Sequence, residues 1–371
     1  MNLGTRHLLT PGRRAQTAAD VARALVALHS TDPATVYLSI AARSDLSVAD
    51  VDTALYGGGE LVRLLAMRRT VWVVPVELVP VVTAACTRQV AAVERRKLVR
   101  LVEEAGIAPD GPRWLATAEA DVLAALAERG DALGEDLRKA VPALEATYSG
   151  APGKAYDRTV AISSRVLLQL AADGRIVRGR PRGSWLSSQY RWRLAPPHED
   201  LDEATAQVEL ARRWLAAFGP TPTTATDLQW WAGWTAATTK RALSAAGAAE
   251  PPNATETDTG TDEPWAALLP ALDPTPMGWK ERGWYLGSYA PQVFDNTGNV
   301  GRTVWWAGRI VGGWGQRADG EVVTRLLEDI GRDGEAAVAE QAERLTKWLG
   351  GVTVVPRFRS PLDRELSESS R

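Results

Sequence analysis

Cysteine and histidine are scarce in this chain. Its 371 residues include one cysteine, Cys86, and three histidines, His7, His29 and His198. A single cysteine cannot form an internal disulfide, which is typical of proteins of the reducing cytoplasm. Cys86 lies in an apolar run and is expected to be a small buried side chain. No spacing of these residues matches a structural or catalytic zinc site, so no metal is expected.

Other features that would indicate a function class are missing as well. No apolar run is long enough to cross a bilayer, and arginine and proline interrupt the first twenty residues, unlike a signal peptide. There is no glycine-rich loop with a following Lys-Ser/Thr and no G-x-S-x-G turn. The sequence therefore predicts a cytoplasmic protein that uses no cofactor.

What the sequence does contain is one concentrated positive segment on a nearly neutral chain. The whole chain carries a net charge of −2, whereas residues 154–193 hold nine basic and two acidic residues, a local charge of +7. Within this segment a helix is expected to end at Asp173-Gly174, and a hairpin over 175–193 follows it. Such a concentration of charge is typical of a surface that binds a polyanion, nucleic acid first.

Arginines of this hairpin recur mostly at every second position, so on a strand they share one face. Guanidinium groups match phosphate oxygens, and an aromatic ring can stack on an unpaired base or pack beneath the hairpin. The alternative is a solvated edge strand protected by its charges. The residues expected to contact nucleic acid are Arg178, Arg180, Arg182, Trp185, Tyr190, Arg191 and Arg193 of the hairpin, Arg165 on the preceding helix, and Arg68 and Arg69 in an earlier turn.

The order of elements predicts an α+β protein in which three helices followed by a hairpin recur, the order of a winged helix. The expected divisions are winged helices over 1–85, 114–196 and 197–263, a connecting helix over 86–113, a β-rich, barrel-like domain over 264–320, and C-terminal helices with a strand over 321–371. Three winged helices without a heptad-patterned dimerisation helix favour a monomer that encloses DNA.

Several segments carry specific expectations. Apolar spacing predicts helices over 20–28 and 156–174, a helix from Pro33 after an Asp32 cap, and another from a Ser47 cap to three glycines. The acidic, breaker-rich segment 250–263 is expected to be a surface loop. Short strands are expected over 283–289 and 302–317, the latter with a hairpin around Ala307-Gly308. A helical pair is expected over 322–331 and 335–351, and a strand over 352–358 before a polar tail.

His29 lies in the segment LHSTDP, at the expected end of one helix and just before the next. A lone histidine at a helix C-terminus most often stabilises the helix end. An imidazole near its neutral form also accepts a proton, and His29, Ser30 and Thr31 together can orient a water. The residues alone leave both interpretations open.

Five segments give the chain a resemblance to a known family. They are LHSTDPATVYLSIAAR, LVRLLAMRRTVWVVP, SSRVLLQLAADGRIVRGRPRGSWLSSQYRW, LLPALDPTPMGWKER and VWWAGRIVGGW. With these, the chain resembles the bacterial winged-helix superfamily that includes the AlkZ and YcaQ DNA glycosylases. The resemblance implies tandem winged helices and a β-barrel in a C-shaped body, with a basic channel for double-stranded DNA.

The resemblance also implies an activity, the excision of bulky or crosslinked N-alkylated purines during DNA repair. In the family a Gln-x-Gln or Gln-x-Asp motif occupies the segment that matches LHSTDP. His29 takes the first position of that motif and Thr31 takes the second, so this chain departs from the pattern at both. Two functions follow: a glycosylase that uses His29 and Thr31, or a non-catalytic DNA-binding protein such as a damage sensor or a transcription regulator.

Overall fold

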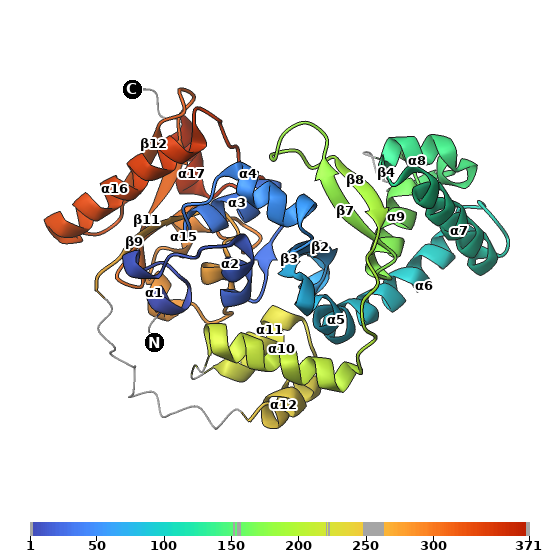
Figure 1. The fold of residues 1–371 in the computed structure, drawn as a ribbon, viewed down its shortest axis with the longest axis horizontal. Coiled ribbons are helices and arrows are strands. Elements are labelled where there is room, and N and C mark those ends of the chain that lie inside the picture. Colours follow the sequence, from blue (N-terminus) through green and yellow to red (C-terminus); the bar gives the residue numbers. More distant parts are fainter. Residues whose placement is uncertain are drawn as a thin grey trace.

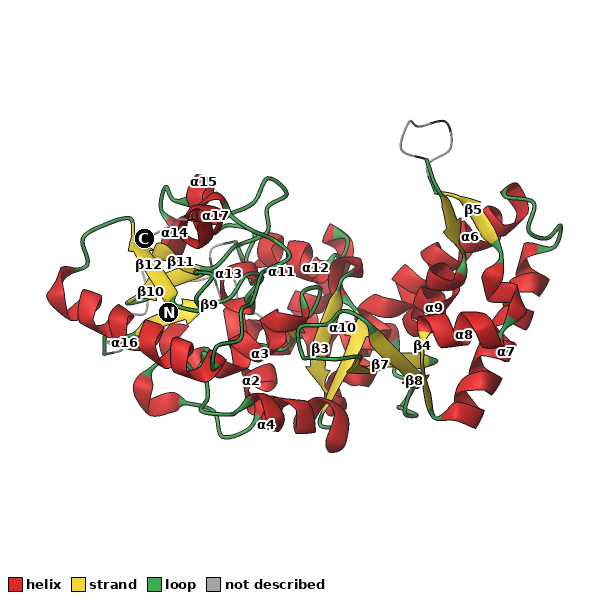
Figure 2. Ribbon diagram, turned by 90° about the horizontal axis from the view of Figure 1, so that it is seen from above, coloured by secondary structure: helices red, strands yellow, loops and turns green. Residues whose placement is uncertain are grey.

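The computed structural model describes residues 3–150, 153, 157–219, 221, 223–247 and 263–368. In both views the residues between about 100 and 175 lie to one side of a larger body, and a hairpin connects the two (Figures 1 and 2). The larger body combines the N-terminal residues with the whole C-terminal third of the chain. Segments that are far apart in the sequence therefore lie together in the larger body.

The N-terminal part contains a three-stranded antiparallel sheet in the order β1-β3-β2. Its elements are α1 (Leu3–Arg6), α2 (Ala18–Ala24), β1 (Leu28–His29), α3 (Pro33–Ala41), α4 (Val48–Asp52), β2 (Leu61–Leu65) and β3 (Val71–Pro75), with short 3₁₀ or π turns at Pro11–Arg13, Thr53–Gly57 and Met67–Arg69. The predicted caps of α3 and α4 are confirmed: the side chain of Asp32 accepts from the Ala34 amide, and that of Ser47 from the Asp50 amide.

The helix predicted over 20–28 begins at Ala18 and ends at Ala24. Val26 has a φ of 65°, a left-handed conformation that β-branched residues rarely adopt and that interrupts a helix. The chain then extends as β1, in which His29 pairs with Trp72 of β3. The prediction that His29 ends a helix is therefore wrong, because the residue lies in an edge strand of the sheet.

One continuous helix, Val76–Glu104, leads from the first part to the second. It consists of a 3₁₀ turn at Val76–Leu78, α5 (Val79–Val82), a π turn at Thr83–Thr87 and α6 (Arg88–Glu104). No apolar run was expected to be long enough to cross a bilayer, but this helix has the length and composition to do so. In its apolar window 56% is buried inside the protein, and Cys86 packs in the main core, which is the environment of a core helix.

The second part holds the basic hairpin. Its elements are α7 (Gly111–Arg129), β4 (Asp131–Leu133), α8 (Gly134–Ala140), a 3₁₀ turn at Pro142–Glu145, β5 (Thr147–Ser149), β6 (Thr159–Ala161), α9 (Ser163–Ala172), β7 (Ile176–Pro181) and β8 (Tyr190–Leu194). The helix predicted over 156–174 starts only at Ser163, because residues 159–161 pair with β5. Lys154 and Tyr156 lie outside the described residues. The hairpin is confirmed, with β8 at the centre of the order β4-β8-β7.

Three helices follow, as predicted: α10 (Glu203–Phe218), α11 (Thr224–Ala232) and α12 (Ala236–Ala245). The expected loop over 250–263 lies outside the described residues except for Glu263. The next strand, β9 (Ala266–Leu269), pairs with β10 (Thr303–Trp306) of the C-terminal sheet. Among the described residues, these three helices are therefore not followed by a hairpin of their own. The assignment of residues 197–263 as a third winged helix therefore stays a prediction, as do the other two.

The C-terminal part is built on a four-stranded antiparallel sheet in the order β12-β11-β10-β9. Its elements are β9 (Ala266–Leu269), α13 (Pro274–Met277), α14 (Gly283–Leu286), α15 (Ala290–Val293), β10 (Thr303–Trp306), β11 (Arg309–Gln316), β12 (Val322–Leu326), α16 (Gly331–Leu349) and α17 (Pro361–Glu368). Within the described residues β9 and β12 are its edges, and the barrel-like domain expected over 264–320 stays a prediction.

Sequence periodicity misassigned several segments here. Residues 283–286 form α14 instead of a strand, residues 322–326 form β12 instead of a helix, and no strand covers 352–358 in this described stretch. The polar tail contains α17, which packs on β11 because Gly313 and Gly315 carry no side chain. A Cβ there would come within 2.7 Å of Leu362 and 2.6 Å of Leu366, respectively.

A fully buried ion pair joins the N-terminal helices to the C-terminal part. The Arg43 guanidinium donates to Asp273 at 2.7 Å, and both side chains have an exposed fraction of zero. Asp273 also accepts from the Ser39 hydroxyl at 2.7 Å, and Thr275 accepts a further Arg43 proton. Each charge is thus paired and hydrogen-bonded, the condition under which buried charge is tolerated.

We expect Arg43→Met to lower the free energy of unfolding by about 3–5 kcal/mol, because it leaves the Asp273 carboxylate buried without its cation. Urea unfolding followed by tryptophan fluorescence measures this. Arg309→Met is the matched control, since Arg309 forms an exposed ion pair with Glu328 and its loss costs about 1 kcal/mol or less. Equal effects of the two substitutions would contradict the role assigned to the buried pair.

Candidate catalytic and DNA-binding site

His29 is held on the inner side of strand β1. Its ring centroid lies 4.7 Å from that of Trp72, and only 4% of the residue is exposed. Burial, together with the nearby positive charge of Arg68, lowers the pKa of His29 from 6.5 to about 3. The imidazole is therefore neutral at physiological pH.

A local hydrogen bond selects the tautomer of that ring. The Thr31 amide donates to Nδ1 of His29 at 3.3 Å. In a neutral imidazole one nitrogen accepts and the other carries the proton, so Nε2 is the donor. His29 can donate a hydrogen bond to an oxygen through Nε2, but it has no free nitrogen with which to take a proton from water.

Thr31 and Asp32 complete this turn in different ways. The hydroxyl of Thr31 is buried and has no hydrogen-bond partner within the described residues. Both Asp32 oxygens are engaged, because they accept from the amides of Ala34 at 3.1 Å and Arg357 at 2.8 Å. The carboxylate nearest in sequence to His29 therefore serves as a cap, as predicted, while the buried Thr31 hydroxyl keeps its hydrogen-bonding capacity unused within the described residues.

Ser30 connects the same turn to the neighbouring strand β2. Its hydroxyl accepts from Nε of Arg63 at 2.7 Å, and Nη1 of Arg63 donates to the Tyr56 hydroxyl at 2.7 Å. The Arg63 guanidinium also lies 4.5 Å from the ring centroid of Tyr190, on the basic hairpin. Through Arg63, the hairpin is placed directly beside the His29–Thr31 turn.

Three predicted DNA-binding arginines of the hairpin already have carboxylate partners. Arg180 pairs with Asp52 at 2.6 Å, Arg182 with Glu135 at 3.0 Å, and Arg191 with Asp131 at 2.7 Å. These pairs are partly exposed, so each contributes little to stability and a phosphate can compete for the guanidinium. Because of these three ion pairs, the hairpin carries less uncompensated positive charge than its sequence indicates.

The other predicted arginines of this part lack such partners. No ion pair involves Arg178 or Arg193 in the described part of the chain; the Arg178 guanidinium lies 5.5 Å from the ring centroids of Tyr190 and Trp192. Nε of Arg193 is buried without a hydrogen bond there. Arg165 donates to the Tyr148 hydroxyl at 3.2 Å. Arg178 thus shares the Tyr190 ring with Arg63, whose guanidinium lies 4.5 Å from the same centroid.

Both predicted aromatic residues pack against other parts of the protein, Trp185 half-buried and Tyr190 buried. Trp185, in the loop between β7 and β8, lies 5.0 Å from Tyr37 of α3 and 5.8 Å from Trp348 of α16 between ring centroids. Figure 1 shows this loop reaching toward α4. Tyr190 is 6% exposed. Of the two expected roles, the structure favours packing for Trp185, which anchors the hairpin to the larger body.

Arg68 and Arg69, in the turn between β2 and β3, behave differently from each other. Arg69 pairs with Glu94 at 2.8 Å. Arg68 lies 4.0 Å from the ring centroid of Trp230, and Arg282 lies 5.0 Å from the same ring. Burial, and the charge of Arg282, lower the pKa of Arg68 to about 10. Two cations without ion pairs among the described residues therefore flank Trp230 on the side of His29.

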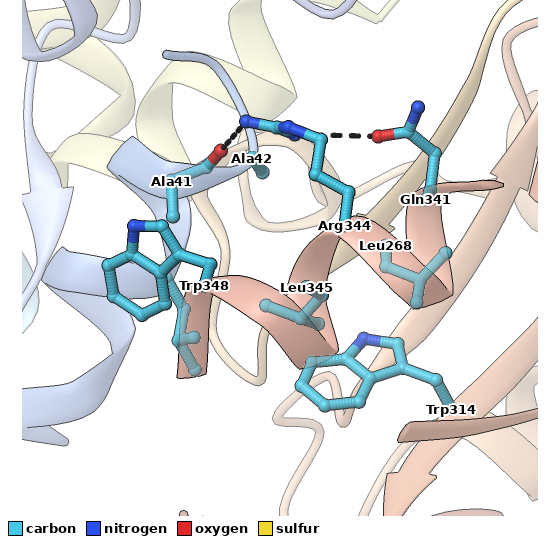
Figure 3. Close-up of a pocket in the computed structure, with 9 residues that line it drawn as sticks. Ala41, Ala42, Leu268, Trp314, Gln341, Arg344, Leu345 and Trp348 are labelled. Atoms are coloured by element: carbon cyan, nitrogen blue, oxygen red, sulfur yellow. Dashed lines mark hydrogen bonds between the residues drawn. The ribbon is translucent and has the colours of Figure 1, made fainter. Parts of the chain in front are cut away.

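Two hollows lie away from the His29 ring. A recess of about 290 Å³ lies beside the hairpin, lined by Arg178, Tyr190 and Trp192 among others. A much smaller space of about 20 Å³ lies between α3, β9, β11 and α16, with Trp314 and Trp348 in its wall, and Arg344 donates to the Ala41 carbonyl across its edge (Figure 3). This second, mostly apolar space lies in the interface between the N-terminal and C-terminal parts.

Sequence reasoning missed the residues that connect these groups. Arg63, Tyr56, Trp230, Arg282 and Arg357 reach the site only through tertiary contacts. A weak signal existed for Arg63, since it is the one charged residue in an apolar strand run, LVRLL. Among the described residues no group of three or more His, Cys, Asp or Glu is arranged to hold a metal.

Comparison with known proteins identifies the relatives of this fold. The family model described as DNA glycosylase AlkZ-like matches residues 22–348. The chain belongs to the AlkZ-like DNA glycosylase family. Membership supports a DNA-binding protein of the DNA-repair glycosylase class.

A solved structure agrees with this assignment at the level of fold. The DNA glycosylase AlkZ from Streptomyces sahachiroi superposes with a TM-score of 0.67 at 18% sequence identity, over 93% of this chain and 94% of that chain. No curated protein sequence matched the chain. The AlkZ-like architecture therefore extends over nearly the whole molecule, while the residues of the site are those of this chain.

The tautomer and charge of His29 are directly measurable. We expect ¹⁵N NMR to show a neutral ring protonated on Nε2 from pH 8 down to pH 5, because its pKa is about 3; the loss of the signal in His29→Asn assigns it. The unfolded chain takes up this proton first, so the stability contribution is full above about pH 6.5 and is lost as the pH falls toward 3. Protonation of His29 between pH 5 and 7 would contradict this structure.

Proposed function

We propose that this AlkZ-like protein is a monofunctional glycosylase that hydrolyses the N-glycosidic bond of alkylated purines, bulky or crosslinked ones included, in double-stranded DNA. One observation carries the proposal: a neutral His29 and the unpartnered Thr31 hydroxyl lie in one turn, between two groups of arginines without ion pairs. Family membership supports the reaction class. We further propose a cytoplasmic monomer.

The chemistry suits uncharged side chains. An alkylated purine carries positive charge, so it leaves with the electron pair of the C1′–N bond and becomes neutral. The oxygen of water then bonds to C1′ while one proton passes to solvent. Little general-base assistance is required at such an electron-poor carbon, and an active site without a free carboxylate at this turn is sufficient.

His29 and Thr31 then have separate roles. Nε2–H of His29 donates to an oxygen of the departing base and so stabilises the charge that arrives there, as preorganised donors do at developing charge. The Thr31 hydroxyl accepts a hydrogen bond from the water and orients its lone pair. A neutral His29 also avoids repelling the cationic substrate, which a protonated imidazole would do.

We expect His29→Ala and Thr31→Val to lower the single-turnover rate of 7-methylguanine release by about 10²-fold each, the usual effect of losing one positioned hydrogen-bonding group. Affinity for duplex DNA with an abasic-site mimic is expected to change less than about threefold. His198→Asn is the matched control, because His198 is exposed and lies in the linker before α10. Loss of DNA affinity in step with the rate would show that His29 is structural.

A non-catalytic DNA-binding protein is the second candidate, and one observation favours it. The His29 ring has no nitrogen free to accept a proton, so it does not reproduce a general base. Wild-type protein that binds adducted duplex yet releases no base above background would establish this function. A sharp sequence-specific footprint on undamaged DNA would indicate a regulator, and selective binding of adducts a damage sensor.

Both functions require DNA binding that weakens with salt, because guanidinium groups replace counterions at the phosphates. The logarithm of the affinity falls with the logarithm of the salt concentration by about 0.9 per phosphate contact. We expect Arg180→Gln/Arg182→Gln to flatten that slope by less than two full contacts, because Asp52 and Glu135 already pair with these side chains. Fluorescence anisotropy at several salt concentrations measures it. In contrast, Asp52→Asn releases Arg180 and is expected to tighten binding; no change in either variant would exclude these arginines from the interface.

A further inference from the structure

Three arginines from distant segments meet beside the turn that follows β1. Arg63 comes from β2 and Arg178 from β7, and Arg357 lies in the segment between α16 and α17. The guanidinium groups of Arg63 and Arg178 lie 4.5 Å and 5.5 Å from the centroid of the same Tyr190 ring. Burial lowers the pKa of Arg178, and so do the charges of Arg63 and Arg357. The backbone of Arg357 is fixed by its hydrogen bond to Asp32. We refer to these residues as the three-arginine cluster.

Arg63 is the buried member of the cluster. It is 3% exposed, and its polar partners are hydroxyl groups, those of Ser30 and Tyr56. No carboxylate pairs with it in the described part of the chain, and its Nη2 is buried without a partner there. An arginine is rarely buried so fully without a counter-charge. This side chain therefore supplies a positive charge that the protein itself leaves uncompensated.

Arg178 and Arg357 are the accessible members. Arg178 lines the recess of about 290 Å³ together with Tyr190 and Trp192, and its guanidinium faces those two rings. Arg357 is exposed. Neither forms an ion pair within the described residues, whereas Arg180, Arg182 and Arg191 of the same hairpin all do. Three arginines of the hairpin are thus neutralised by carboxylates, whereas Arg178, beside Tyr190 and Arg63, is not.

The acidic groups nearby are already engaged. Asp32 accepts from two backbone amides. Asp52 accepts from the Tyr37 hydroxyl at 2.6 Å and from Arg180. The hydroxyl of Tyr190 is buried without a hydrogen bond among the described residues. An excess of fixed positive charge beside unsatisfied polar atoms fits an anion rich in oxygen, and guanidinium groups match the geometry of phosphate.

We propose that the three-arginine cluster binds a backbone phosphate of the DNA strand next to the nucleotide that faces His29. Arg178 and Arg357 contact the phosphate oxygens. Arg63 is a positioning residue: it holds Ser30 and Tyr190 in place and adds its charge from below. The inference rests on the proposed glycosylase function, since it assumes that damaged duplex lies along the His29–Thr31 turn.

Neutral phosphate analogues test this contact. Duplexes carry an abasic-site mimic, and the phosphates around it are replaced one at a time by methylphosphonate, which removes the charge. With wild-type protein we expect one position to raise the dissociation constant about tenfold or more, the usual effect of losing a hydrogen bond between charged groups. In Arg178→Gln the unmodified duplex binds about as weakly, and the same methylphosphonate adds less than about twofold.

A double-mutant comparison decides the outcome. Arg309→Gln, which removes an exposed, paired charge on the distant sheet, is expected to keep the full methylphosphonate penalty. The inference is overturned if no position gives a penalty, or if Arg178→Gln keeps the penalty of the wild type. Arg357→Gln provides a second test, because this exposed side chain is not needed for folding, and it too is expected to abolish the penalty.

Two further arms separate the alternatives. If inorganic phosphate alone shifts the Arg178 side-chain NMR signal while methylphosphonate has no effect on DNA binding, the cluster is a free-anion site and the DNA assignment is wrong. Release of 7-methylguanine is assayed in parallel. Normal release without coupling to Arg178 refutes only the phosphate contact, whereas coupling without any release refutes the glycosylase and leaves the contact standing.

Discussion

Antiparallel pairing of β1 with β3 is the constraint on which the site depends. It places His29 opposite Trp72 and extends the chain so that successive side chains point to opposite faces of the sheet. His29 faces the aromatic core and Arg68, while Ser30 faces Arg63. The end of β1 thus lies between Arg68 on one face and Arg63 on the other. In the turn that follows, the Thr31 amide sets the tautomer of the His29 imidazole.

The distribution of unpaired positive charge depends on which arginines form ion pairs, not on how many basic residues a segment contains. Residues 154–193 carry a local charge of +7, yet the fold brings Asp52, Asp131 and Glu135 against three of the arginines. Among the described residues, Arg178 and the buried Arg63 keep no carboxylate partner, and both lie beside the Tyr190 ring. Exposed pairs are weak and exchangeable, whereas a cation without a partner in a partly buried place attracts an anion strongly. The proposed phosphate contact rests on this difference.

Local signals predicted the elements that depend on a few neighbouring residues. Asp32-Pro33 and Ser47 begin helices, Met67–Arg69 turns between strands, and Ala307-Gly308 closes a hairpin. Predictions failed where a distant partner decided the conformation: residues 322–326 became a strand because β11 pairs with them, and α17 forms on a surface that Gly313 and Gly315 leave open. His29 was misplaced for the same reason, since β3 lies some forty residues away.

By itself, the sequence determined the family, the basic hairpin and the departure from glutamine at His29 and Thr31, because each of these is written in contiguous residues. Only the tertiary structure decided which arginines stay free of carboxylates, that Trp185 packs against Tyr37 and Trp348, and that the His29 ring is neutral with its proton on Nε2. Charge pairing, burial and hydrogen bonding depend on atoms that lie a few ångströms apart in space, and most of those atoms belong to segments remote in the chain.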